Sequence, residues 1–238
     1  MISRAEIQKL TVKFQTLELN VRREYYQHLF LSYFYQQKNT NRVYFKGGTA
    51  LRIIYQSPRF SEDLDFSTNL RDVKVLEQTI LLTLQEIERE GVVVSLKEAK
   101  ETSGGYLAIV GFETDEKSVV IQLEISLRQG DKKGEVVTIA NDFVPPYTIV
   151  SLRREQLVEE KVEALLSRKK PRDFYDLYYI LRHGLFSLDQ KRLLAQVKEV
   201  LRLTEINFEV ELKQFLPKSH WAVIRNFGQA LEREIERN

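Results

Sequence analysis

In this sequence, the residue types and spacing of two glycines and two carboxylates suit a site that carries out chemistry. Gly47 and Gly48 lie between a short apolar run and a helical pattern, where a glycine pair lets the backbone approach a ligand closely. The free N–H groups of the helix start favour phosphate oxygens, and the hydroxyl of Thr49 adds a donor. Asp63 and Asp65 are two positions apart on a predicted strand, so both carboxylates leave the same face. Such oxygen pairs suit Mg²⁺, which also takes phosphate oxygens.

A third carboxylate lies in the middle of an apolar strand. The alternation over residues 119–127 puts Glu124 on the face opposite the apolar residues, where it needs a partner or a metal. Together with Asp63 and Asp65 it would hold two Mg²⁺ ions, which clamp the attacking and leaving oxygens of a phosphoryl displacement. Other carboxylates lie nearby, at a strand end and turn: Glu113, Asp115 and Glu116.

A second group of charged residues follows in a helical part of the sequence. Lys161 and Arg168 share a helix face at i and i+7 spacing. A proline then indicates a new helix with proline at its first position, which makes Asp173 the third residue, where a carboxylate favours the helix dipole. The purely structural interpretation of this block is a helix start with an ion pair between Arg172 and Asp176, and a solvated Lys161.

The order of these motifs resembles the signature of the polymerase-β-like nucleotidyltransferase superfamily. More narrowly, the segments 46–51 (KGGTAL) and 59–67 (RFSEDLDFS) closely resemble the AbiEii/AbiGii family, the nucleotidyltransferase toxins of bacterial abortive-infection systems. The segments 160–168 and 171–178 are similar to the C-terminal Lys and Arg-Asp motifs of that family. The resemblance spans residues 1–185, and the helices after residue 185 carry no matching motif.

The resemblance implies transfer of a nucleotide from a nucleoside triphosphate (NTP) to a hydroxyl acceptor. The acceptor hydroxyl attacks the α-phosphorus and pyrophosphate leaves. The implied metal ligands and catalytic carboxylates are Asp63, Asp65 and Glu124, with Mg²⁺, or alternatively Mn²⁺, as the cofactor. Lys161 is implied as a catalytic contact to the triphosphate, joined by Lys46. The implied nucleotide-binding residues are Lys46, Gly47, Gly48, Thr49, Ser61, Arg168, Arg172 and Asp173.

The resemblance also implies partners. The acceptor would be an RNA 3′ end, with tRNA as one candidate, or a protein hydroxyl. The family works beside a separately encoded antitoxin in phage defence. The basic run 168–172 is compatible with RNA phosphates, as is the lead segment 1–60, with ten Lys and Arg against three Glu. Residues 61–130 hold seven Lys and Arg against fourteen Asp and Glu, which suits a metal-binding cluster, although solvated helix faces explain the same asymmetry.

Two other functions compete with this interpretation. The segment 63–67 loosely resembles the aspartyl-phosphate phosphatases, whose first Asp is a nucleophile. No later acidic pair follows a strand, however, and the preceding Gly-Gly-Thr goes unexplained. The other alternative is a non-catalytic RNA- or antitoxin-binding module on the same fold. Because Asp63, Asp65 and Glu124 are all present, the catalytic interpretation is favoured.

The composition excludes several classes of protein. The 238 residues include no cysteine, which excludes a disulfide framework, a thiolate zinc site and a cysteine nucleophile. The three histidines are far apart, so no His-rich metal motif is visible. No apolar run approaches the roughly 20 residues of a membrane span, and the N-terminus has no apolar signal region. We therefore expect a soluble, cytoplasmic protein without a membrane partner.

The elements that must position these residues follow from periodicity and capping signals. Ser3 and Glu6 have capping-box spacing, which predicts a helix from Arg4. A second helix over 17–37 carries an aromatic stripe that indicates core packing. A long helix over 70–90 has Asn69 as its predicted cap. The remaining predictions for this half are strands at 43–46, 64–66, 92–96, 106–112, 119–127 and 136–139, and a helix at 49–56.

From Leu152 onward the pattern is almost all helical. The predicted helices cover 153–168, 172–182, 188–202, 207–215 and 220–236. The fold class is therefore α+β, with a mixed sheet and flanking helices, as in the polymerase-β-like nucleotidyltransferases, followed by a C-terminal helical domain. We expect a nucleotidyltransferase domain over 1–147, with the N-terminal helices, and a helical domain over 148–238, because a proline pair breaks the strand pattern at 145–146.

Overall fold

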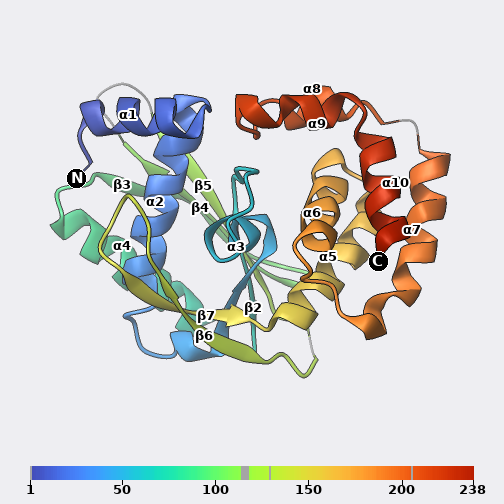
Figure 1. Cartoon of the computed structure of the whole chain (residues 1–238). Coiled ribbons are helices and arrows are strands. Elements are labelled where there is room, and N and C mark those ends of the chain that lie inside the picture. Colours follow the sequence, from blue (N-terminus) through green and yellow to red (C-terminus); the bar gives the residue numbers. More distant parts are fainter. Residues whose placement is uncertain (1, 114–117, 129, 205) are drawn as a thin grey trace. The chain divides into compact units, whose positions relative to one another are not determined.

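The computed structural model describes residues 2–113, 118–128, 130–204 and 206–238. The chain divides into two compact units (Figure 1). The sheet unit comprises Met1–Gln56 and Phe60–Leu152, and the helical unit comprises Ser57–Arg59 and Arg153–Asn238. The division lies at the end of strand β7, Tyr147–Leu152, rather than at its start, because this strand pairs on both sides within the sheet.

The described residues of the sheet unit form a seven-stranded mixed sheet. In hydrogen-bonding order the strands are β3 (Val94–Thr102), β4 (Gly105–Phe112), β5 (Val119–Ser126), β2 (Leu64–Thr68), β1 (Val43–Lys46), β7 and β6 (Gly134–Ile139). The pairs β2/β5 and β1/β7 are parallel, and the other pairs are antiparallel. This mixed sheet confirms the predicted fold class. Strand β7 is missing from the sequence prediction, which places the end of the sheet at the proline pair.

Four helices and one short turn complete the sheet unit. They are α1 (Arg4–Phe14), α2 (Glu18–Phe34), η1 (Thr40–Arg42), α3 (Gly47–Ile53) and α4 (Val73–Arg89). The predicted capping box is present, since Ser3 Oγ accepts from the backbone N–H of Glu6 at 3.2 Å. Helix α4 takes Asp72 as its cap and not Asn69, because the Asn69 amide donates instead to Tyr44 Oη at 3.0 Å.

Aromatic side chains from α2 fill the core of the sheet unit, where α2 and α4 lie side by side against the sheet (Figure 1). The ring of Phe34 lies 5.4 Å from that of Phe66 on β2, which lies 5.6 Å from that of Phe45 on β1. Tyr26 stacks on Phe112 of β4 at 4.5 Å. These contacts confirm the core role of the aromatic stripe. The face of β1 and β2 opposite this core therefore carries other side chains.

The helical unit is built around α6. Its elements are α5 (Arg154–Arg168), α6 (Pro171–Arg182), η2 (Leu188–Gln190), α7 (Arg192–Leu203), α8 (Phe208–Leu212), η3 (Lys218–His220), α9 (Trp221–Arg225) and α10 (Phe227–Arg237). Proline occupies the first turn of α6 as predicted, and residues 173–181 of this helix are all buried. A helix buried on all sides, as α6 is over these residues, is typical of the centre of a helical core.

The helix predicted over 220–236 is interrupted at Asn226, whose φ of −122° and ψ of 42° are not helical.

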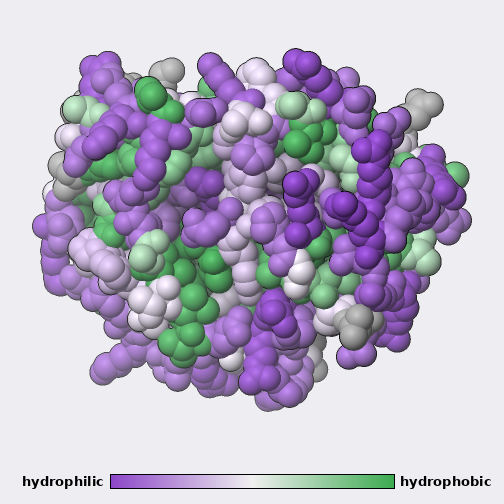
Figure 2. Space-filling view, in the orientation of Figure 1, coloured by the Kyte–Doolittle hydropathy of each residue, from purple (hydrophilic) through white to green (hydrophobic). Residues whose placement is uncertain are grey.

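Hydrophilic side chains cover most of the face shown in Figure 2, and hydrophobic ones gather in small groups. Within the described part of the chain, none of the helices combines the length and the apolar content that crossing a bilayer requires.

Candidate functional site

Three charged residues lie in one row across the sheet unit. Lys46 on β1 pairs with Asp65 on β2, and Asp65 pairs with Glu124 on β5. Residues paired across neighbouring strands lie about 4.8 Å apart and point to the same face. Asp63 comes directly before β2, two positions from Asp65. The structure thus brings the predicted residues Lys46, Asp65 and Glu124 together as direct neighbours.

Gly47 is required by its contact with Asp65. Its φ is +84°, a conformation that favours glycine. A Cβ at this position would overlap the Asp65 carboxylate, so only glycine lets that carboxylate lie against the turn between β1 and α3. Helix α3 begins at Gly47 rather than at Thr49, and Gly48 is buried in its first turn. The predicted order of strand, Gly-Gly and helix is confirmed.

The segment that leads into β2 is held by side chains from two helices. Thr49 in α3 is fully buried, and its hydroxyl donates to the carbonyl of Asp63. Gln27 in α2 donates from Nε2 to the carbonyls of Ser61 at 3.0 Å and Glu62 at 3.1 Å. The Thr49 hydroxyl, predicted to donate to phosphate, therefore holds the backbone beside Asp63 instead. Gln27 has no predicted role, and its only sequence signal is a polar residue inside an aromatic helix.

Glu124 is exposed, which differs from the expectation of a carboxylate that needs a partner inside an apolar strand. Burial along β5 alternates, so the apolar residues face the core while Glu124 lies on the open face. Its Oε1 accepts from Gln122 Nε2 on the same strand at 2.5 Å. Of the alternative carboxylates, Asp115 and Glu116 lie outside the described residues.

The chemistry of this row fits a hard divalent cation. Mg²⁺ is held in proteins by one or two carboxylates together with substrate phosphates and water. Asp65 and Glu124 are adjacent across two strands, and the absence of a side chain at Gly47 leaves room for the Asp65 carboxylate itself. Among the described residues, no group of three or more His, Cys, Asp or Glu is arranged to hold a metal ion. A cation here would therefore rely on the adjacent Asp65 and Glu124, with substrate phosphates and water as its other ligands.

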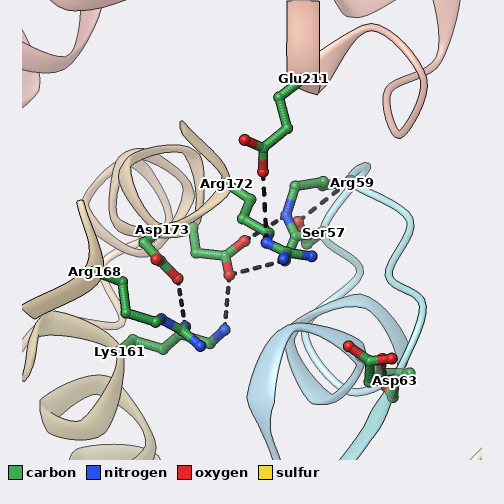
Figure 3. Close-up of polar contacts among 10 residues, drawn as sticks. Ser57, Arg59, Asp63, Lys161, Arg168, Arg172, Asp173 and Glu211 are labelled. Atoms are coloured by element: carbon green, nitrogen blue, oxygen red, sulfur yellow. Dashed lines mark hydrogen bonds and ion pairs between the residues drawn. The ribbon is translucent and has the colours of Figure 1, made fainter. Parts of the chain in front are cut away.

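A second set of the predicted residues lies within the helical unit (Figure 3). Asp176 accepts two hydrogen bonds from Arg59, from Nε at 2.7 Å and from Nη2 at 2.9 Å. Lys161 Nζ donates to the same carboxylate at 2.8 Å and is only 11% exposed, so it is not a solvated lysine. Burial opposes ionisation of Asp176, but Arg59 and Lys161 outweigh that effect and lower its pKa to about 2. Arg59 lies in a recognised motif, yet nothing local predicts this role.

The other charged residues of α6 also take partners within the helical unit (Figure 3). Asp173, 1% exposed, accepts from Arg168 Nη2 at 2.7 Å. Arg172 Nε lies 3.5 Å from Glu211 Oε1. The predicted ion pair between Arg172 and Asp176 is therefore wrong. A carboxylate on a fully buried helix takes its partners from packed neighbours, which overrides the local i,i+4 preference.

Comparison with known proteins supplies independent evidence. Residues 29–234 match the family described as "Nucleotidyl transferase AbiEii toxin, Type IV TA system". The crystal structure of JHP933 from Helicobacter pylori is similar, with 21% identity and a TM-score of 0.60 over 93% of this chain and 95% of that one. A second H. pylori structure, of a candidate nucleotidyltransferase, has 21% identity and a TM-score of 0.61 over 93% of this chain and 98% of that one. No curated protein sequence matches the chain.

The two kinds of comparison carry different weight. At 21% identity, the likeness to the H. pylori structures shows a shared fold. The family match extends over most of the chain and includes the Gly-Gly and Asp-X-Asp motifs of the sheet unit and the charged helices of the helical unit. The chain therefore belongs to the AbiEii family of nucleotidyl transferase toxins from type IV toxin–antitoxin systems.

Proposed function

We propose that the chain moves a nucleoside monophosphate from an NTP to a hydroxyl acceptor in a Mg²⁺-dependent reaction at the sheet unit. The observation that carries the proposal is the row of Lys46, Asp65 and Glu124, with Gly47 against the Asp65 carboxylate. Membership of the AbiEii family supports nucleotidyl transfer. The row supplies what that chemistry needs, namely carboxylates for a cation and a positive charge for phosphate.

The carboxylates are proposed to hold the cofactor. Asp63, Asp65 and Glu124 would bind Mg²⁺, or Mn²⁺ in its place. When bound, the cation neutralises phosphate charge and lowers the pKa of the acceptor hydroxyl. The triphosphate is proposed to bind at the turn of Gly47 and Gly48, as the family resemblance implies, where the Asp65 carboxylate lies against the same turn.

The reaction is an in-line displacement at the α-phosphorus. The acceptor hydroxyl gives its proton to water and its oxygen forms a bond to that phosphorus. The bond from phosphorus to the bridging oxygen breaks, and pyrophosphate leaves. Lys46 is proposed to stabilise the charge on the phosphates from its place beside Asp65. Family resemblance supports Lys161 as a second phosphate contact, with Arg168 and Arg172 as further candidates. These three cations have carboxylate partners in the helical unit.

Family membership and the exposed cations of the helical unit support our proposals for the acceptor and the partners. We propose an RNA 3′ end, tRNA included, or a protein hydroxyl as the acceptor. The run Arg168–Lys170 is exposed, and clustered cations of this kind suit RNA phosphates. A separately encoded antitoxin is the proposed protein partner, as the type IV system implies. The cytoplasm, where both would be found, is the proposed location.

Transfer of label tests the proposal. The purified chain is incubated with Mg²⁺, total tRNA and one α-³²P-labelled NTP at a time, beside an Asp65→Ala variant. We expect label to enter RNA or protein with the wild type and not with the variant. The labelled band then identifies the acceptor, and the active lane identifies the base. If folded wild type transfers no label with Mg²⁺ or Mn²⁺, transfer to these acceptors is contradicted and the non-catalytic binding module is favoured.

A further inference from the structure

We infer that Arg59 is a positioning residue that acts through Asp176 on Lys161. The inference rests on the proposed function, in which Lys161 contacts phosphate. The segment Ser57–Arg59 belongs to the helical unit, although the chain on either side of it belongs to the sheet unit. Ser57 is itself buried, and its Oγ accepts from the backbone N–H of Arg59 at 3.4 Å. The three residues of this segment thus belong to the helical unit, and Arg59 is the charged residue among them.

Arg59 fixes the orientation of Asp176. Its Nε and Nη2 donate to the two different carboxylate oxygens at 2.7 and 2.9 Å, and the two side chains are 3% and 1% exposed. A two-point contact from a planar guanidinium sets the plane of the carboxylate as well as its position. The oxygen that accepts from Lys161 Nζ at 2.8 Å is therefore held in one place.

The Asp176 carboxylate is shared by two cations. It accepts from both Arg59 and Lys161, and Asp173 on the same helix accepts from Arg168 and also acts electrostatically on Arg59. Lys161 is the most exposed of the three clustered side chains, at 11%. Of the two cations that share Asp176, Lys161 is therefore the one that an anion such as phosphate can approach.

Loss of Arg59 would change what Lys161 can do. The Asp176 carboxylate would then no longer be shared with a guanidinium, so it would hold the Lys161 ammonium group more strongly and leave it less able to bind phosphate. Arg59→Ala should therefore weaken anion binding although Arg59 itself need not contact the anion. Arg59→Lys keeps the charge but loses the two-point contact, so it should give an intermediate loss.

Binding of pyrophosphate tests this coupling without requiring an acceptor. The full chain is titrated calorimetrically with pyrophosphate in Mg²⁺ buffer as wild type, Arg59→Ala, Lys161→Ala and the double variant. We expect about a tenfold loss of affinity for each single variant and no further loss in the double variant, because both changes remove one coupled interaction. Arg202→Ala is the charge control, since it removes a cation from an exposed ion pair with Glu232 in the same unit. The affinity of Arg202→Ala for pyrophosphate should equal that of the wild type.

Several outcomes would overturn the inference. They are wild-type affinity in Arg59→Ala, single losses that multiply in the double variant, and wild-type chain that binds pyrophosphate weakly or independently of Lys161. Thermal unfolding checks each variant, and Arg59→Lys replaces an Arg59→Ala protein that does not fold. Lys161-dependent pyrophosphate binding without any transfer of label would contradict the proposed function while supporting the coupling. Transfer of label without Lys161-dependent pyrophosphate binding would support the proposed function and contradict the coupling.

Discussion

Aspartate is used in opposite ways in the two units. In the sheet unit Asp63 and Asp65 are half-buried, and Glu124 is exposed on the same sheet. In the helical unit Asp173 and Asp176 are each 1% exposed and pair with cations of that unit. A carboxylate already compensated by buried cations gains little from a further one. Adjacent carboxylates on an open face repel each other unless a cation lies between them.

Arginine shows the same division. In the sheet unit, Arg52 donates to the Glu24 carboxylate from Nε at 2.8 Å and from Nη2 at 3.1 Å. Arg59 and Asp176 in the helical unit have almost the same geometry, but Lys161 makes a second cation. The two pairs therefore share a geometry and differ in what else the carboxylate accepts from. The hydrogen bond from Lys161 to Asp176 is the feature that the proposed function uses.

The largest expected effect is the loss of Asp65. Asp65→Asn keeps the size of the side chain and should lower the rate of transfer by about 10³-fold, the scale of a principal electrostatic contribution to a transition state. The free energy of unfolding should hardly change, because the side chain is half-buried. Asp176→Asn should instead lower the free energy of unfolding, since it removes the buried carboxylate charge to which Arg59 and Lys161 both donate. Initial rates of transfer and urea unfolding are measured for both variants. A wild-type rate of transfer by Asp65→Asn would contradict the expected contrast between the two variants.

A smaller effect is expected at Gly47. Gly47→Ala would push the Asp65 carboxylate out of place, and a displacement of about 1 Å costs about 10²-fold in rate. Gly91→Ala is a matched control, because its φ of +81° is similar to the +84° of Gly47 but no atom lies within 4 Å of the added Cβ. The control should lose about 1 kcal/mol of stability to backbone strain and no activity. Equal rates for the two variants would show that contact with Asp65 is unimportant.

Glu124 should give a smaller loss again. Glu124→Gln removes one charge from an exposed side chain and should lower transfer about tenfold, an effect typical of weakened metal binding. Because the loss is one of metal affinity, raising the Mg²⁺ concentration should restore part of the rate. Titration of Mg²⁺ against initial rate checks this. An unchanged titration curve would leave Glu124 as a solvated strand carboxylate.

The sequence predicts the elements whose signals are local. The capping box of α1, the Gly-Gly turn before α3, the alternation of β5 and the proline at the start of α6 are set by neighbouring residues. Strand β7 is not predicted, because two prolines precede it and its pairing with β1 depends on distant chain. The break at Asn226 is not predicted either, since α9 and α10 continue one apolar pattern across it.

The same limit applies to the candidate site. Asp63 and Asp65 are predicted from their spacing together with the preceding Gly-Gly motif, and the sheet makes Asp65 and Glu124 direct neighbours. The partner of Asp176 is 117 residues away at Arg59, so short-range rules favour Arg172 instead. Such rules describe an exposed helix, whereas α6 is buried and its partners are chosen by packing.

The smallest effect on activity is expected at His28, whose contribution should appear in acid stability instead. His28 is buried in the sheet unit with Nδ1 2.7 Å from Tyr147 Oη, and burial lowers its pKa to about 3. An unfolded histidine binds its proton near pH 6.5, so the folded state loses about 1.4 kcal/mol for each pH unit as pH falls from about 6.5 to 3. Asp176, with a folded pKa of about 2, keeps its contribution above its unfolded pKa of about 3.9 and loses it only between about pH 4 and 2.

These two pH windows separate the units. His28→Gln should flatten the dependence of the free energy of unfolding on pH between 6.5 and 4, the range in which Asp176→Asn should change the level but not the slope. Urea unfolding at half-unit steps of pH measures both. If the slope above pH 4 survives in His28→Gln, the acid sensitivity comes from groups other than this buried histidine. If Asp176→Asn removes that slope, its carboxylate is not held ionised by Arg59 and Lys161, and the contrast between the buried carboxylates of the helical unit and the half-buried ones of the sheet unit fails.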